Sequence, residues 1–233
     1  MHALLAACLA VLIGAVASCT RSDSDSRAAP SVPPAQPGPA LEDEDGRPLV
    51  VCLGDSLTAG YGLVESQSYP SVLQRTIDEE DLGFRVMNAG VSGDTTAGGL
   101  RRLDWALQGE VRVLVVALGG NDALRGLSVN EMRDNLSTIV ERAHSRGAVV
   151  VLAGMQAPPN FGPEYTTAFR EAFVEVAARQ RTPFIPFLLA GVAGEASLNQ
   201  ADGIHPNARG AEIVAGTVWQ ALRPILQQLS TTQ

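Results

Sequence analysis

The chain has 233 residues and a formal net charge of −8, and all 17 of its basic residues are arginine. We do not expect it to bind nucleic acid, because that requires a stripe of positive charge to neutralise the phosphates. The lack of lysine also excludes P-loop nucleotide hydrolases, which need a lysine at the phosphates, and Schiff-base enzymes, which need an amine nucleophile.

The first 18 residues have the pattern of a lipoprotein signal peptide. Residues 4–16 form an apolar run that is short for a bilayer span, and Val-Ala-Ser-Cys at residues 16–19 resembles a lipoprotein cleavage site. The sequence therefore predicts transport across the inner membrane, lipid attachment to Cys19, and a membrane-anchored protein of the periplasm or cell envelope. A signal peptide cleaved without lipid attachment and a buried N-terminal helix are the alternatives.

Residues 19–46 are predicted to be a disordered tether that begins with the lipidated cysteine. The stretch from residue 20 is rich in Ser, Asp, Pro, Ala and Glu, and it has too few large apolar residues to offset the entropy of ordering. Residues 47–233 have the length of one globular domain. Cys52 is the only cysteine in it, which excludes an internal disulfide and a four-ligand Cys/His zinc site. We expect Cys52 to be a small core residue.

Apolar runs and helical patterns alternate along this domain. The runs are continuous rather than alternating, as in strands buried on both faces, and they lie at residues 49–53, 84–87, 111–118, 148–153 and 183–187. Helices are predicted at 129–143, at 166–179 and from Pro206 to Gln220 or beyond, with Pro224 kinking or breaking the last one. The expected fold is α/β: a flavodoxin-like three-layer α/β/α sandwich with a five-stranded parallel sheet.

Polar clusters follow four of the predicted strands. They are Gly-Asp-Ser-Leu at residues 54–57, the stretch 88–94, Gly-Gly-Asn-Asp at 119–122 and, after a longer segment, Asp-Gly-Ile-His-Pro at 202–206. A parallel sheet brings the carboxyl ends of its strands to one edge, and ligands bind there. The sequence therefore predicts one active site at that edge.

A serine, a histidine and an aspartate at this edge have the properties needed for acyl transfer. Ser56 needs a base to become a nucleophile, and histidine is the side chain that titrates near neutral pH. His2 lies in the signal peptide and His144 near the end of a helix, which leaves His205 as the base. Asp202, three residues earlier, is expected to orient His205. The alternative for residues 202–206 is a simple turn before the last helix.

The tetrahedral intermediate of acyl transfer needs hydrogen-bond donors for its negatively charged oxygen. We expect an oxyanion hole made by the backbone N–H groups of Ser56 and Gly93 and the side-chain amide of Asn121. A plain turn after a strand is the alternative for residues 119–122. Asp55 and Asp122 are interpreted as acceptors for backbone N–H groups that hold the loops, not as proton carriers.

The four blocks together resemble the SGNH (GDSL) hydrolase superfamily. The matching residues are Gly-Asp-Ser-Leu at 54–57, Gly93, Gly-x-Asn-Asp at 119–122 and Asp-x-x-His at 202–205. Residues 92–100, 118–126, 159–165 and 202–207 further resemble a bacterial branch of acyl-CoA thioesterases, lysophospholipases and arylesterases. The resemblance extends from residue 50 to 226. Members of this branch are usually free periplasmic enzymes, so the predicted anchor depends on the cleavage-site pattern alone.

The resemblance implies a serine esterase with a shallow acyl-binding groove that hydrolyses small-molecule or lipid acyl esters or thioesters, without a metal or other cofactor. Leu57, Pro158, Pro159 and Phe161 are candidates to line the groove, or equally to pack the loops. A carbohydrate O-acetyl esterase and a non-catalytic surface binding module on the same fold are the alternatives. The sequence does not indicate an oligomeric state.

Overall fold

The computed structural model of the protein describes residues 46–231. The predicted signal peptide, Cys19 and nearly all of the predicted tether lie outside this range. Within it, no helix combines the length and the apolar character that crossing a bilayer requires.

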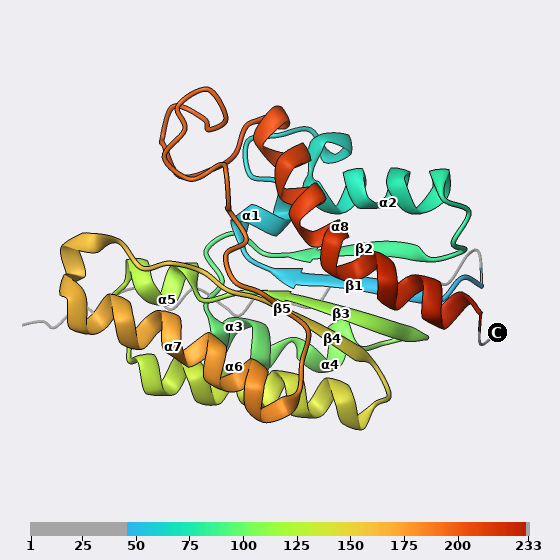
Figure 1. Cartoon of the computed structure of the whole chain (residues 1–233), viewed down its shortest axis with the longest axis horizontal. Helices are drawn as coiled ribbons and strands as arrows, with labels where there is room; N and C mark the ends of the chain where they lie inside the picture. Colours follow the sequence, from blue (N-terminus) through green and yellow to red (C-terminus); the bar gives the residue numbers. More distant parts are fainter. Residues whose placement is uncertain (1–45, 232–233) are drawn as a thin grey trace, which may run out of the picture. The chain divides into compact units, whose positions relative to one another are not determined.

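A five-stranded parallel sheet forms the centre of the domain (Figure 1). Its strands are β1 (Leu49–Gly54), β2 (Arg85–Gly90), β3 (Val111–Ala117), β4 (Val149–Ala153) and β5 (Phe184–Ile185), in the order β2-β1-β3-β4-β5. The predicted fold class is confirmed. Val and Leu dominate the central strands β1, β3 and β4 because both faces of the sheet are covered, and Cys52 is fully buried there as expected.

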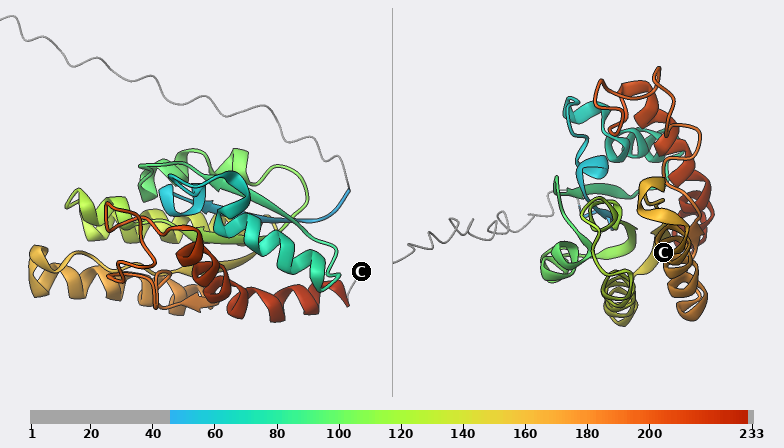
Figure 2. Two further views of the ribbon diagram at one scale, coloured as in Figure 1. Left: turned by 90° about the horizontal axis from the view of Figure 1, so that it is seen from above. Right: turned by 90° about the vertical axis from the view of Figure 1, so that its left-hand side faces the viewer.

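Helices cover both faces of the sheet, as Figures 1 and 2 show. On one face α2 (Tyr69–Glu79) packs against α8 (Ala208–Ser230), and on the other α6 (Val129–Ser145) packs against α3 (Thr96–Arg101) and α7 (Gly162–Gln180). Shorter helices lie in the connections: α1 (Ser56–Ala59), α4 (Leu103–Ala106) and α5 (Gly120–Leu124), with 3-10 turns at Glu65–Gln67 and Pro159–Phe161.

The last helix extends beyond Gln220 as predicted, but its start differs from the prediction. It begins at Ala208 rather than Pro206, because Pro206 pairs with Asn199 in an isolated bridge and the Asn207 side chain caps the helix at Gly210 N. Pro224 was expected to kink or break the helix; it does not break it, because α8 continues to Ser230. Pro224 is exposed, so water can reach the carbonyl that loses its partner, while leucines on the opposite side remain buried in the core.

The strand order places a crevice between the carboxyl ends of β1 and β3. These strands are neighbours, but the chain leaves β1 through α2 on one face and enters β3 from the helices of the other face. Such a reversal opens the sheet edge for a ligand. Ser56 follows β1 and Asn121 follows β3, so both lie at this crevice.

Candidate active site

Ser56 is held at the sheet edge by a tight turn from β1 into α1. The carboxylate of Asp55 caps this short helix by accepting a hydrogen bond from the backbone N–H of Leu57 at 3.0 Å. The turn also needs a glycine on the neighbouring strand, because a Cβ built on Gly90 would overlap the backbone of Ala59. As the first residue of α1, Ser56 has a backbone N–H without a partner inside the helix.

His205 and Asp202 reach the same edge on the long connection between β5 and α8, drawn in orange in Figure 1. The bridge between Asn199 and Pro206 closes this connection, and the backbone N–H of Gln200 donates to the His205 carbonyl at 2.8 Å. His205 Nε2 lies 2.9 Å from Ser56 Oγ, and His205 Nδ1 lies 2.7 Å from Asp202 Oδ2. The expected serine, histidine and aspartate are therefore joined in one hydrogen-bonded chain.

The Asp202 carboxylate is stabilised in its charged form. Its Oδ1 accepts the backbone N–H groups of His205 at 3.0 Å and Ile204 at 2.9 Å. The backbone hydrogen bond from His205, followed by the His205 side chain and the Ile204 N–H, lowers the pKa of Asp202 to about 2. An ionised Asp202 at neutral pH favours the tautomer of His205 that carries its proton on Nδ1 and leaves Nε2 to accept from Ser56.

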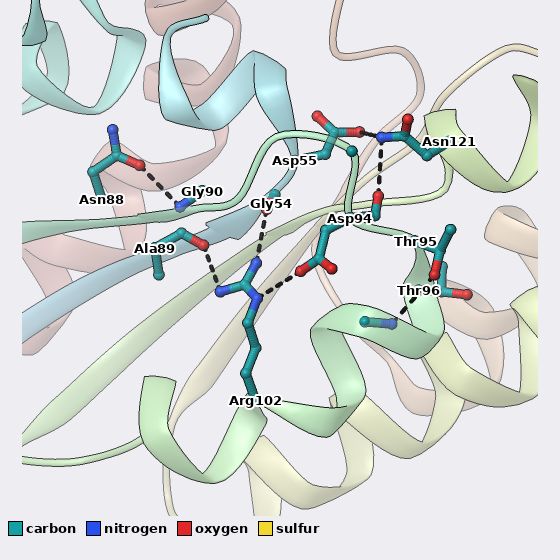
Figure 3. Close-up of polar contacts among 12 residues, drawn as sticks. Gly54, Asp55, Asn88, Ala89, Gly90, Asp94, Thr95, Thr96, Arg102 and Asn121 are labelled. Atoms are coloured by element: carbon teal, nitrogen blue, oxygen red, sulfur yellow. Dashed lines mark hydrogen bonds and ion pairs between the residues drawn. The ribbon is translucent and has the colours of Figure 1, made fainter. Parts of the chain in front are cut away.

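Gly93 and Asn121, the expected oxyanion donors besides Ser56 itself, line the same groove as Ser56. Gly93 adopts a left-handed conformation with φ of 82°, which a residue with a side chain would rarely tolerate. The Asn121 amide nitrogen donates to the Asp94 carbonyl at 2.9 Å and to the Asp55 carboxylate at 3.2 Å (Figure 3). Both amide protons thus point at protein acceptors, so an oxyanion would have to share or replace one of these contacts.

Both aspartates that flank the site residues hold backbone N–H groups, as interpreted from the sequence. Asp122 accepts from the Thr96 N–H at 2.9 Å and the Thr96 hydroxyl at 2.6 Å, which ties α5 to α3. Asp55 is 3% exposed, and this burial raises its pKa to about 6, although the Leu57 N–H and Asn121 donate to it. The two carboxylates of the site, Asp55 and Asp202, are therefore shifted in opposite directions.

A groove of about 600 Å³ opens beside Ser56 and His205. Its lining is mostly apolar and comes from loops at the carboxyl edge of the sheet; it includes Leu57, Leu124, Met155, Ala157, Pro158, Pro159, Phe187, Leu189 and Ile204. Three of the four candidates from the sequence are in this lining. Phe161 is not among them, and its ring packs 5.3 Å from that of Tyr165.

Two contacts of the histidine loop were not predicted from the sequence. The Tyr61 ring lies 4.6 Å from the His205 ring, and the Gln200 amide donates to the Tyr61 carbonyl at 2.6 Å. The two segments are 139 residues apart in the chain, and neither has a motif that marks the contact. Among residues 46–231, no three His, Cys, Asp or Glu side chains gather as a metal site.

Comparison with known proteins agrees with this geometry. The profile of the GDSL-like lipase/acylhydrolase family matches residues 52–213, which include the serine, histidine and aspartate of the hydrogen-bonded chain. This chain belongs to that family. The GDSL motif itself is the turn at residues 54–57 that carries Ser56.

Members of the GDSL-like family resemble this chain over most of the domain. Esterase TesA of Pseudomonas aeruginosa is 43% identical over 187 residues, 80% of this chain and 93% of TesA. Thioesterase 1/protease 1/lysophospholipase L1 of Escherichia coli K12 is 34% identical over 76% of this chain and 84% of that protein. The crystal structure of esterase EstA from Pseudoalteromonas sp. has a TM-score of 0.73 and 32% identity, over 77% of this chain and 98% of EstA.

Proposed function

We propose that this protein is a serine esterase that hydrolyses acyl esters or thioesters, with Ser56 as nucleophile, His205 as general base and Asp202 as its orienting carboxylate. The observation that carries the proposal is the placement of His205, with one ring nitrogen 2.9 Å from Ser56 Oγ and the other 2.7 Å from Asp202. Hydrolysis of carboxylic esters agrees with the names of the relatives, which are esterases, an arylesterase and a thioesterase.

The reaction has two half-reactions. His205 Nε2 takes the proton of Ser56 as Oγ attacks the acyl carbonyl, and it then gives that proton to the departing alcohol or thiol as the carbon–oxygen or carbon–sulfur bond breaks. Water attacks the acyl-Ser56 ester in the second half, again losing a proton to His205, and the acid leaves as Ser56 regains its proton. The Asp202 carboxylate stabilises the imidazolium in both halves.

Negative charge on the carbonyl oxygen is stabilised by Ser56 N–H, Gly93 N–H and the Asn121 amide. The 2.9 Å bond to the Asp94 carbonyl fixes the plane of the Asn121 amide. The amide nitrogen lies 3.2 Å from the Asp55 carboxylate in the longer contact, and the proton of this contact is the one that an oxyanion beside Ser56 would share. Donors held in place before the reaction cost no reorganisation when charge develops.

The groove supports an acyl ester as substrate. Its lining is mostly apolar, and its volume exceeds what an acetyl group needs, which favours acyl chains of several carbons over the acetyl groups of a carbohydrate. Arylesters, lysophospholipids and acyl thioesters share this feature, because each presents an acyl chain next to a scissile carbonyl.

We further propose that residues 1–18 are a signal peptide that is cleaved off, and that the mature protein is a lipoprotein held at the membrane through Cys19. The support is the sequence pattern at residues 4–19. This places the esterase in the periplasm or cell envelope, with residues 19–46 as the connection to its anchor.

The proposal is tested with Ser56→Ala and a matched surface variant, Ser66→Ala. Ser66 is exposed and lies outside the groove. With p-nitrophenyl esters, Ser56→Ala is expected to lower kcat by about four orders of magnitude because the nucleophile is lost. Ser66→Ala should retain the wild-type rate, and all three proteins should have the same melting temperature.

A fluorophosphonate probe and a substrate panel separate the alternatives. Labelling of the wild type but not of Ser56→Ala supports a serine hydrolase, whereas an unlabelled wild type without turnover indicates a binding module. The panel compares acetyl with medium-chain p-nitrophenyl esters, acyl-CoA and acetylated xylan. Turnover of acetylated xylan in preference to every longer acyl ester would replace the acyl-ester proposal with a carbohydrate esterase.

A further inference from the structure

Arg102 is a partly buried arginine behind the catalytic edge that the proposed mechanism does not use. It lies between α3 and α4, and its side chain is 16% exposed. Three guanidinium nitrogens bind three different segments: Nε donates to the Asp94 carboxylate at 2.6 Å, Nη1 to the Ala89 carbonyl at 2.7 Å and Nη2 to the Gly54 carbonyl at 2.8 Å (Figure 3).

Each of these acceptors is close in the chain to a proposed oxyanion donor. Gly54 is two residues before Ser56 at the end of β1, and Asp94 directly follows Gly93 in the loop after β2. The Asp94 carbonyl also accepts the Asn121 amide at 2.9 Å. One guanidinium therefore connects, directly or through Asp94, the three segments that carry all three donors.

The chemistry of the contact suits arginine and no other side chain. Its planar guanidinium is always charged and directs several N–H groups at fixed angles, whereas a lysine ammonium is a point charge on a flexible stem. The ion pair with Asp94, whose side chain is 14% exposed, is screened little by water. A Cβ built on Gly98 would overlap the Asp94 carboxylate, so the fold leaves room at that position for the ion pair.

We infer that Arg102 is a positioning residue for the oxyanion hole: it fixes the distances among Ser56 N–H, Gly93 N–H and the Asn121 amide without touching the substrate. This inference rests on the proposed function. Loss of the three Arg102 hydrogen bonds lets the Gly93 loop move relative to the end of β1. Stabilisation of the transition state then falls, while binding of the neutral ester is kept.

The test compares Arg102→Lys and Arg102→Met with the same substitutions at Arg101, which is the adjacent arginine and is exposed. Active sites are counted by end-point titration with a p-nitrophenyl phosphonate, and folding is followed by thermal denaturation. Both Arg102 variants are expected to lose about 100-fold in kcat per titrated site with little change in KM, because small displacements of catalytic donors cost this much. The Arg101 variants should match the wild type.

A transition-state readout separates positioning from stability. n-Butylboronic acid becomes a tetrahedral anion on the serine, so its inhibition constant should rise in each Arg102 variant in parallel with the loss of kcat/KM. An Arg102 that served only the stability of the fold would lower the melting temperature and leave both constants, per titrated site, at their wild-type values. That result overturns the inference.

Gly98→Ala keeps the test decisive if the Arg102 variants do not fold. This change removes no charge and adds a methyl group that displaces the Asp94 carboxylate from Arg102. Its folded fraction should show a weaker boronate affinity and a lower kcat, and wild-type values for both would contradict the inference. Absence of turnover and of Ser56 labelling in the wild type would instead reject the proposed function itself.

Discussion

At the scale of single residues, Asn121 combines a structural role with a proposed catalytic role, and both use the same amide nitrogen. It joins the loop after β2 to the end of β1, through Asp94 and Asp55, and it is proposed to receive an oxyanion. Asn121→Ala is expected to lower kcat by about 10²–10³, the usual cost of one oxyanion donor. Steady-state kinetics on titrated enzyme measure this. Reduced stability together with an unchanged kcat would show that the residue has only its structural role.

Asp55 gives the molecule a stability that depends on pH. Its pKa is raised from 3.8 to about 6 by burial, so between these values the folded protein binds a proton that the unfolded chain releases. The folding stability that Asp55 contributes is therefore lost as the pH rises through this window, and it does not change further at higher pH. Relative to Asp55→Asn, the wild type should lose up to about 3 kcal/mol of unfolding free energy between pH 4 and 7.

Urea unfolding at a series of pH values checks this, with Asp202→Asn as the control. The pKa of Asp202 is lowered to about 2, so the stability from this carboxylate is present above its ordinary pKa of 3.8 and is lost as the pH falls toward 2. Above pH 4.5 Asp202 is ionised in both the folded and the unfolded state, so its own titration adds no pH dependence to the difference between wild type and Asp202→Asn. A constant difference for Asp55→Asn would mean that Asp55 titrates normally.

At the scale of elements, the packing of α1 against β2 depends on the absence of a side chain at Gly90. A Cβ there would meet backbone atoms of Thr58 and Ala59, which cannot move aside as a flexible side chain can. Gly90→Ala should therefore cost roughly 1–3 kcal/mol of stability, as overpacking does, and should lower kcat by displacing Ser56. Thermal unfolding and kinetics measure the two effects.

Gly216→Ala is the matched control for this substitution. Gly216 lies exposed in the middle of α8, and a Cβ there meets nothing within 4 Å. Alanine should stabilise that helix by up to about 1 kcal/mol because glycine is a poor helix former. Opposite signs for the two glycine-to-alanine changes are expected, and a stabilised Gly90→Ala would show that α1 is free to shift.

Elements were predictable where a periodic or continuous apolar pattern determines them. The runs in β1, β3 and β4 and the stripe of α6 lie close to their predicted bounds, because burial on one or both faces leaves a direct trace in the residue types. The start of α8 was not predictable from Pro206 alone, since a pairing with Asn199 keeps that proline in the loop. Local propensity there is overridden by a contact made in the folded loop.

At the scale of the whole molecule, the site joins residues that are far apart in the chain. Ser56 and His205 are separated by 149 positions, yet the sequence was enough to bring them together, because parallel strands collect the segments after their carboxyl ends at one edge. The contacts of Arg102 and of Tyr61 with that edge could not be predicted from the sequence. They depend on where a long side chain points and how two loops meet, and neither leaves a pattern in the sequence.

The predicted anchor at Cys19 determines where the whole molecule works. Acyl chains on a cysteine hold a protein at a bilayer through the burial of methylene groups, about 0.8 kcal/mol for each. In cells that express the full chain, the wild type is expected to take up labelled palmitate and to sediment with membranes, while Cys19→Ser should do neither. Cys8→Ser is the matched control, because Cys8 lies inside the predicted signal peptide and should not affect labelling.

Esterase activity per titrated site should be equal in all three proteins, since Cys19 lies outside residues 46–231 and their catalytic edge. Unlabelled wild type in the soluble fraction would instead favour cleavage without lipid attachment, and the enzyme would then reach its esters by diffusion.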